Sequence, residues 1–193
     1  MSRCSWAESS PLMQAYHDHE WGRVVTDDQR LFEFLVLEMM QAGLSWSIVL
    51  NKRASLAEAF AQFDYQKIAQ FTEEKVATLV QNPKIIRHRL KLQAVIHNAQ
   101  CFMAIQQEFG SFARYLWQFT DGKIIHHHWT SLEQVPTQDK YAQIISKDLK
   151  KRGFKFVGPV TIYSYMQAIG MVNDHLTSCD CYGELVQQTQ VDL

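Results

Sequence analysis

The chain has few of the residues that interrupt or cross-link a polypeptide. It holds 4 prolines, 8 glycines and 4 cysteines among 193 residues, and no segment has the composition of a linker or a low-complexity tract. Four cysteines in a chain of this size, with no export signal before them, are better suited to free thiols or metal ligands than to a disulfide framework.

Long apolar runs and an excess of charge are also missing. The first residues, Met1 to Trp6, lack the apolar stretch of a secretory signal, and no run of about 18 apolar residues occurs elsewhere. We therefore expect a cytoplasmic protein with no membrane segment. The formal net charge is −1, so that any binding to nucleic acid must come from local basic patches.

What is present is a composition suited to one folded unit. Hydrophobic residues make up 47% of the chain, enough to bury a sizeable core without disulfides. We expect a single domain over residues 1–193, with residues 183–193 as a frayed tail and a monomer as the default state.

Helical periodicity dominates the chain and predicts an all-α fold. Residues 120–136 show no sustained period and are predicted to be a loop, and no pair of alternating strands is evident. Capping residues and apolar spacing predict helices at about 28–41, 45–60, 87–109, 112–119, 138–153 and 158–170, with two shorter helices capped by Asp64 and Thr72.

Four potential metal ligands occur at the two ends of the chain. Cys4 and His17 lie near the start, and His175 and Cys179 lie near the end. Two thiolates and two imidazoles form a common closed, structural zinc site, which here would tie the terminal segments together. Spacing alone leaves Cys181 as an alternative to Cys179.

Two further features of the sequence bear on this proposed zinc site. The run His126-His127-His128 is interpreted as surface, because adjacent residues in a loop cannot all face one ion. Asp174 could accept the second ring N–H of a ligand histidine.

Glu38 is an acid on an apolar helix face. It follows Leu31 by seven residues and Phe34 by four, which places all three on one side of the predicted helix. A buried charge costs several kcal/mol unless it is paired or neutralised. The alternatives to a functional acid are a pair with Arg53, Lys52 or a backbone donor, or a helix that turns Glu38 towards solvent.

The helix that carries Glu38 ends in a short turn. Enzymes that extract a base from duplex DNA need a wedge, aromatic faces and polar groups that read the base edge. Leu44, Trp46 and Glu38 supply one candidate of each kind, although ordinary core packing also explains each aromatic taken singly. Further aromatic residues lie nearer the N-terminus: Trp6, Tyr16 and Trp21.

Two basic groups are candidates for phosphate contacts, the first of them in a predicted hairpin between two helices. Such groups can equally be solvated faces. The first comprises Lys84, Arg87, His88, Arg89 and Lys91, and the second comprises Lys147, Lys150, Lys151, Arg152 and Lys155.

Several separated motifs together resemble one known family, the 3-methyladenine DNA glycosylase I enzymes. The similarity runs from Arg3 to about Tyr182. It rests on Arg3-Cys4-Ser5-Trp6, Tyr16-His17-Asp18, Glu20-Trp21-Gly22, Glu38 with Gln41-Ala42-Gly43-Leu44-Ser45-Trp46, Ile85-Ile86-Arg87-His88-Arg89, Arg152-Gly153-Phe154-Lys155-Phe156-Val157-Gly158, Met166-Gln167-Ala168 and Asn173-Asp174-His175.

This resemblance implies a helix-hairpin-helix superfamily fold with an added zinc site. It implies that Glu38 hydrogen-bonds the edge of an extruded base and that Tyr16 and Trp46 bracket the ring of that base. The residues that the resemblance implies are Cys4, His17, His175 and Cys179 for zinc, Trp6, Tyr16, Glu38 and Trp46 for the base, and Gln41, Gly43 and Leu44 for DNA. The aromatic cluster adds Trp21 as a candidate for the base, and the basic hairpin adds Lys84, Arg87 and Arg89 as candidates for DNA.

The chain departs from the family pattern at Met39 and Met40, which follow Glu38 directly, and at Lys84, where the hairpin commonly has glycine. The first departure could reshape the pocket wall. The second bears on the turn of the hairpin, because lysine tolerates a positive φ poorly.

The expected reaction is hydrolysis of the N-glycosidic bond of N3-alkylated adenine in double-stranded DNA. Ionised Glu38 would stabilise cationic character, and electron-rich Trp46 and Tyr16 would favour a cationic base. No lysine lies between Glu38 and Trp46, which predicts a monofunctional enzyme that leaves an abasic site. Two alternatives remain: a zinc-stabilised helical module that binds damaged DNA without catalysis, and an enzyme acting on a small molecule.

Overall fold

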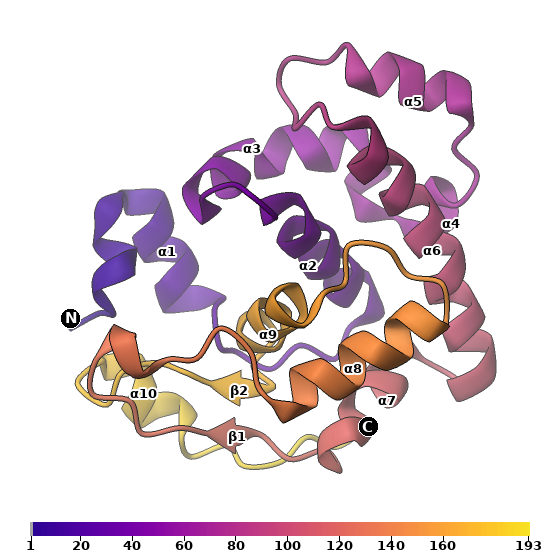
Figure 1. Cartoon of the computed structure of the whole chain (residues 1–193). Coiled ribbons are helices and arrows are strands. Elements are labelled where there is room, and N and C mark those ends of the chain that lie inside the picture. Colours follow the sequence, from indigo (N-terminus) through magenta and orange to yellow (C-terminus); the bar gives the residue numbers. More distant parts are fainter. Residues whose placement is uncertain (1) are drawn as a thin grey trace.

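The computed structural model describes residues 2–193, and helices make up most of it (Figure 1). Among these residues, no helix has both the length and the apolar character needed to cross a bilayer. The helices are α1 (Pro11–His19), α2 (Asp28–Gln41), α3 (Trp46–Ala59), α4 (Tyr65–Ile68), α5 (Glu73–Val80), α6 (Arg89–Phe109), α7 (Phe112–Trp117), α8 (Lys140–Lys151), α9 (Pro159–Ala168) and α10 (Asp180–Leu185), with 3₁₀ turns at η1 (Ser5–Ser9), η2 (Ala61–Phe63), η3 (Gln118–Thr120) and η4 (Leu132–Gln134).

The predicted helix starts are confirmed by their caps. The Asp27 side chain accepts a hydrogen bond from the backbone N–H of Arg30 at the start of α2. Asp64 and Thr72 cap α4 and α5 in the same way. Each cap satisfies a backbone donor that would otherwise lack a partner in the first turn of the helix.

Helix α2 lies at the centre of the molecule beside α9, with the other helices around them (Figure 1). Every side chain from Leu31 to Met40 except Glu33 is buried, because α2 contacts α3, α6, α7 and α9 on different sides. This burial explains why the helix has almost no polar face. It also explains how Glu38 comes to lie deep inside the protein.

The all-α prediction holds for the helices but misses one small sheet. Strand β1 (Ile125–His126) pairs in parallel with β2 (Val172–Asn173). With only two residues in each strand, there is no alternation long enough to detect. Residues 120–136, predicted to be a loop, also contain η4.

The expectation of a frayed tail over residues 183–193 is wrong. Helix α10 continues to Leu185, and the chain then returns alongside β1. Ile124 donates its backbone N–H to the carbonyl of Thr189 at 3.0 Å, and Val191 donates to Gly122 at 2.9 Å. Val191 is buried against the core. In Figure 1 the C-terminus therefore lies near β1 and α7, away from the N-terminus.

Candidate active site and metal centre

A cavity of about 280 Å³ lies between the N-terminal helices and α9. The structure brings to it all the residues that the sequence and the resemblance suggest for a base, together with Gln41 of the predicted wedge turn. Its walls are Trp6, Met13, Tyr16, Trp21, Glu38, Gln41, Trp46, Leu132, Val135, Ser164, Gln167 and Asp174.

The Glu38 carboxyl faces this cavity without a protein partner. The residue is 5% exposed, and its Oε2 atom forms no hydrogen bond within residues 2–193. Arg53, the alternative partner, instead binds Glu33 at 2.8 Å and Glu20 at 2.9 Å. Burial raises the pKa of Glu38 to about 8. Burial therefore favours the neutral carboxyl in the unliganded protein, and an ionised Glu38 beside a cationic base stays a prediction.

Two aromatic side chains also present unpartnered polar atoms here. The hydroxyl of Tyr16 and the indole Nε1 of Trp46 are buried, and neither has a hydrogen-bond partner among the described residues. Burial raises the pKa of Tyr16, so the hydroxyl stays protonated. With Glu38, these are the only buried side-chain N or O atoms of residues 2–193 that lack a partner. Since such atoms are costly, their convergence on one cavity indicates a polar ligand.

The aromatic rings form one continuous wall, not two separated faces. The ring centroids of Tyr16 and Trp46 lie 5.1 Å apart at an interplanar angle of 44°. A flat base between two parallel rings needs a separation of about 7 Å, twice an ordinary carbon contact. The predicted bracketing by Tyr16 and Trp46 therefore does not fit this arrangement. Trp6 continues the wall to Trp21, with their centroids 5.1 Å apart.

Helix α9 supplies the polar side that the sequence argument missed. Ser164 and Gln167 are three residues apart, so they share one face of the helix, and both line the cavity. Leu132 and Val135 of the segment around η4 add an apolar edge. The motif containing Gln167 contributed to the family resemblance, but nothing in its local sequence indicated that it faces Glu38.

Asp174 lies beside Gln167 and is fully hydrogen-bonded. Its Oδ1 atom accepts from His127 Nδ1 at 2.6 Å and Trp129 Nε1 at 2.8 Å. Its Oδ2 atom accepts from Tyr163 Oη at 2.7 Å and Gln167 Nε2 at 2.8 Å. The suggestion that Asp174 orients a ligand histidine is therefore wrong.

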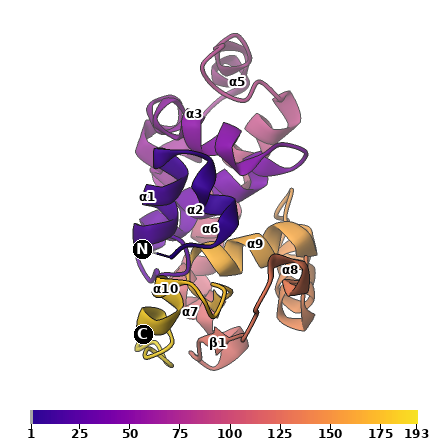
Figure 2. The same ribbon diagram turned by 90° about the vertical axis from the view of Figure 1, so that its left-hand side faces the viewer.

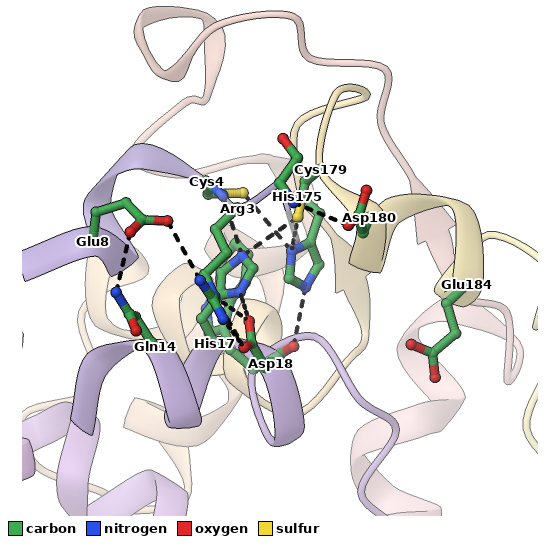
Figure 3. Close-up of polar contacts among 12 residues, drawn as sticks. Arg3, Cys4, Glu8, Gln14, His17, Asp18, His175, Cys179, Asp180 and Glu184 are labelled. Carbon is green, nitrogen blue, oxygen red and sulfur yellow. Dashed lines mark hydrogen bonds and ion pairs between the residues drawn. The ribbon is translucent and has the colours of Figure 1, made fainter. Parts of the chain in front are cut away.

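The four predicted metal ligands form one buried group (Figure 3). Cys179 Sγ lies 3.5 Å from both His17 Nε2 and His175 Nδ1, and Cys4 Sγ lies 3.8 Å from His175 Nδ1. Atoms bound tetrahedrally to one zinc ion are about 3.5 Å apart for a sulfur and a nitrogen. The donor set and its spacing therefore fit a metal ion of this kind.

Outer partners orient both imidazoles of this group. His17 Nδ1 lies 2.8 Å from Asp18 Oδ1, and Arg3 donates to Asp18 at 2.8 Å (Figure 3). The Arg3 hydrogen bond holds the pKa of Asp18 at about 2. His175 Nε2 lies 3.1 Å from the backbone oxygen of Trp21. Such contacts leave the opposite ring nitrogen free to bind a metal.

The neighbouring cysteine and histidines take other positions. Cys181 is buried next to His17, but it is not part of the four-residue group. The three adjacent histidines point to different partners: His126 to the backbone of Gln188, His127 to Asp174, and His128 to Tyr182. As expected, they do not converge on one ion.

The buried Cys/His group and the aromatic wall are in direct contact. The Trp21 ring lies 4.6 Å from that of His175, and the Trp6 ring lies 5.3 Å from that of His17, measured between centroids. Figure 2 shows α1 and α10, which carry or adjoin these groups, on the same side of the molecule. The wall therefore depends on the arrangement of the four ligands.

The turn after α2 exposes the predicted wedge. Gly43 has a φ of +77°, a conformation that favours glycine. Leu44 is 38% exposed. Lys91 donates from Nζ to the backbone oxygens of Met40 and Ala42 at 3.0 and 2.7 Å. It therefore supports this turn and is not free for a phosphate.

The predicted hairpin lies between α5 and α6. Lys84 and Arg87 are exposed, and Arg89 pairs with Glu73 at 3.1 Å. Lys84 does not have a positive φ, so the departure from glycine causes no backbone strain. Lys52 donates to the carbonyl of Lys84 at 3.1 Å, which ties the hairpin to α3.

The structure also places Met39 and Met40, the other departure from the family pattern, and Arg152 of the second basic group. Met39 and Met40 are fully buried in the core, and neither lines the cavity. Arg152 binds Glu108 at 2.7 Å and Asp148 at 2.8 Å, so its guanidinium already has carboxylate partners.

Comparison with known proteins shows the family of the chain. The model of the methyladenine glycosylase family matches residues 6–182. A helical fold with an acid in an aromatic cavity and an exposed wedge defines a base-excising class of protein, and the chain belongs to the methyladenine glycosylase family.

Named relatives cover nearly the whole chain. DNA-3-methyladenine glycosylase 1 of Escherichia coli (strain K12) is 47% identical over 182 residues, which cover 94% of this chain and 97% of the relative. A crystal structure of 3-methyladenine DNA glycosylase I has a TM-score of 0.91 at 49% identity, covering 93% of this chain and 99% of that one. A Staphylococcus aureus structure that describes 3-methyladenine recognition has a TM-score of 0.89 at 39% identity, with 93% and 96% covered.

Proposed function

We propose that this chain removes 3-methyladenine from double-stranded DNA by hydrolysing the N-glycosidic bond, and that the cavity around Glu38 holds the extruded base. The carrying observation is the convergence of three unpartnered polar atoms, on Tyr16, Glu38 and Trp46, in one aromatic cavity. Membership of the methyladenine glycosylase family supports the same substrate.

The chemistry requires little from the protein beyond placement and electrostatics. Methylation at N3 gives the purine a positive charge. When the bond between the sugar and the base breaks, its electron pair neutralises that charge, and water adds to the sugar carbon with loss of a proton. Glu38 would contact the edge of the base, and the cationic lesion would favour its ionised form. The aromatic wall of Trp6, Tyr16, Trp21 and Trp46 would favour the cationic base over neutral adenine.

Contacts to DNA are assigned to two exposed features, the turn after α2 and the hairpin between α5 and α6. Leu44, with Gln41 and Gly43 in the same turn, would fill the place of the extruded base. The hairpin between α5 and α6, which we assign as the helix-hairpin-helix element, would bind the backbone through Lys84, Arg87 and Arg89. The lining of the cavity, among the described residues, contains no lysine. This supports a monofunctional enzyme that leaves an abasic site with the strand intact.

We assign zinc to Cys4, His17, His175 and Cys179, because two thiolates and two imidazoles form a closed structural set with no open position for substrate. Bound zinc would supply folding energy and hold the aromatic wall. We also propose that residues 1–193 act as one domain, in the cytoplasm and as a monomer. The continuous core from Met13 to Val191 supports the first of these.

The test is release of free base from methylated duplex DNA. The native chain is expected to release 3-methyladenine and leave uncut abasic strands, while Glu38→Gln is expected to bind DNA and release much less. Binding of methylated DNA without release would instead indicate the non-catalytic module. Affinity for DNA that hardly changes with salt would favour the small-molecule enzyme, because phosphate contacts make affinity fall steeply with salt.

A further inference from the structure

Gln167 has an amide orientation that its neighbour determines. Its Nε2 atom lies 2.8 Å from Asp174 Oδ2. A carboxylate only accepts hydrogen bonds, so the amide nitrogen and not the oxygen must face Asp174. The Gln167 oxygen, Oε1, then lies on the other branch of the amide. No donor within residues 2–193 binds it, and Gln167 lines the cavity.

Asp174 itself cannot easily turn to release this amide. Trp129 Nε1 can only donate, and it binds Oδ1 at 2.8 Å, while Tyr163 donates to Oδ2 at 2.7 Å. His127 adds a further contact to Oδ1 at 2.6 Å. With the residue 1% exposed, the carboxylate is fixed from several sides. It therefore holds the Gln167 amide in one orientation, with its acceptor turned away from Asp174.

We propose that Gln167 is a specificity-determining residue whose Oε1 accepts a hydrogen bond from the 6-amino group of the bound purine, and that Asp174 is its positioning residue. This rests on the proposed function. The 6-amino group carries two hydrogens, one for Gln167 and one for Glu38. A purine with a 6-oxo group offers no hydrogen at this place and would set an oxygen against the acceptor of Gln167.

Ionised Glu38 accepts only and would add to this distinction, but the remaining polar groups of the cavity do not depend on it in the same way. The hydroxyls of Tyr16 and Ser164 can donate or accept, so each can rotate to suit either purine. Trp46 Nε1 can only donate, so it does not disfavour the oxygen of a 6-oxo purine. Neutral Glu38 can also donate. Asp174 also lines the cavity as an acceptor held by its neighbours, but both of its oxygens already accept hydrogen bonds. Gln167 Oε1 has no donor within residues 2–193, so Gln167 would make methylated adenine preferred over methylated guanine or hypoxanthine.

The test compares binding of two free bases, 3-methyladenine and 3-methylhypoxanthine, by quenching of tryptophan fluorescence. In the native protein the 6-amino base is expected to bind tighter. Gln167→Met retains the side-chain length and removes the acceptor, so the ratio of the two dissociation constants is expected to fall by about tenfold or more. Gln143→Met, the same change at an exposed site on α8, is expected to leave the ratio unchanged.

A second variant tests the positioning by Asp174. Asp174→Asn can present its amide nitrogen to Gln167, which then turns its own nitrogen into the cavity. The preference is expected to weaken or reverse, and adding Gln167→Met to Asp174→Asn is expected to give a ratio within twofold of that of Gln167→Met alone. Melting temperature and zinc content are measured alongside, because loss of structure would weaken both bases equally and leave the ratio intact.

A native ratio retained in Gln167→Met would overturn the proposal. Release of 3-methyladenine from methylated DNA by the native chain is measured in parallel. If the native chain releases no base, the proposed function fails. If it releases base while Gln167→Met keeps full selectivity, only the assignment of Gln167 fails.

Discussion

The ammonium of Lys91 lies 2.7 Å from the carbonyl oxygen of Ala42 and 3.0 Å from that of Met40. These carbonyls belong to the last turn of α2 and its cap, where helical partners are absent. Burial removes water from the Lys91 ammonium and lowers the pKa of Lys91. The two backbone carbonyls take the place of the water that an exposed ammonium would bind. The side chain links α6 to the turn that exposes Leu44.

Replacing Lys91 is therefore expected to affect DNA more than the free base. Lys91→Met keeps the length of the side chain and removes the donors. Loss of hydrogen bonds from a charged group costs roughly 1.5–3 kcal/mol, so single-turnover excision from duplex DNA is expected to fall by roughly 10- to 100-fold. Affinity for free 3-methyladenine is expected to change by less than twofold. Lys67→Met, an exposed lysine on α4, is the control, and an equal loss of free-base affinity would contradict the assignment.

The raised pKa of Glu38 predicts that Glu38 lowers the free energy of unfolding of the unliganded protein by an amount that depends on pH. The folded-state pKa is about 8, against 4.5 for an ordinary glutamate. Between these values the unfolded chain loses the proton first, so the free energy of unfolding decreases as pH rises. Glu38→Gln removes this cost, which is roughly 3 kcal/mol at pH 7.

Thermal melting from pH 4.5 to 8.5 measures this effect. The stability gained by Glu38→Gln is expected to grow through that range and to level off above pH 8. Glu58→Gln, at an exposed position of α3, serves as the comparison. A constant difference between native chain and Glu38→Gln would show that Glu38 is ionised throughout.

Loss of the metal is expected to weaken the base pocket as well as the fold. Cys179→Ser removes a ligand, and Trp21 and Trp6 pack on the imidazoles of the same group. The melting temperature is expected to fall by roughly 10 °C or more, at about 2–4 °C per kcal/mol for a chain of this size. Free-base affinity falls with it. Cys101→Ser, on α6, is expected to change neither, and full base affinity in metal-free protein would refute the coupling.

If the exposed hairpin contacts phosphates, a change in it should alter the salt dependence of DNA affinity and leave the affinity for the free base unchanged. Arg87→Ala is expected to lower DNA affinity for all sequences and to reduce the slope of log affinity against log salt by about 1. Free 3-methyladenine binding is expected to stay the same. Fluorescence anisotropy at several salt concentrations measures the slope, and Lys67→Ala is a matched removal of charge. An unchanged slope would remove Arg87 from the DNA contact.

Local patterns were enough to predict most helices and the four residues of the buried Cys/His group. Asp27, Asp64 and Thr72 cap their helices within the first turn, so the relevant contacts are close in sequence. The burial of Glu38 followed from the apolar residues on its own helix face. Family resemblance resolved the choice between Cys179 and Cys181, which spacing alone left open.

Contacts between distant residues were not accessible in this way. The partners of Asp174 include His127 and Trp129, 47 and 45 residues away. The pairing of residues 189–191 with residues 122–124, just before β1, depends on main-chain atoms that carry no sequence signal. Lys91 looked like one more member of a basic run, because only the fold shows that α6 brings it to the end of α2. The separation of Tyr16 and Trp46 likewise depends on how α1 packs against α3.

The contact between Cys4 and His175 joins residues 171 positions apart. During synthesis on the ribosome, the acid and the wedge leave the exit tunnel long before the last metal ligand does. A nascent chain therefore has Glu38 and Leu44 while the wall formed by Trp6 and Trp21 still lacks its backing. The pocket can therefore form only after His175 and Cys179 have been synthesised, and a chain that terminates before them is expected to lack the support for Trp6 and Trp21.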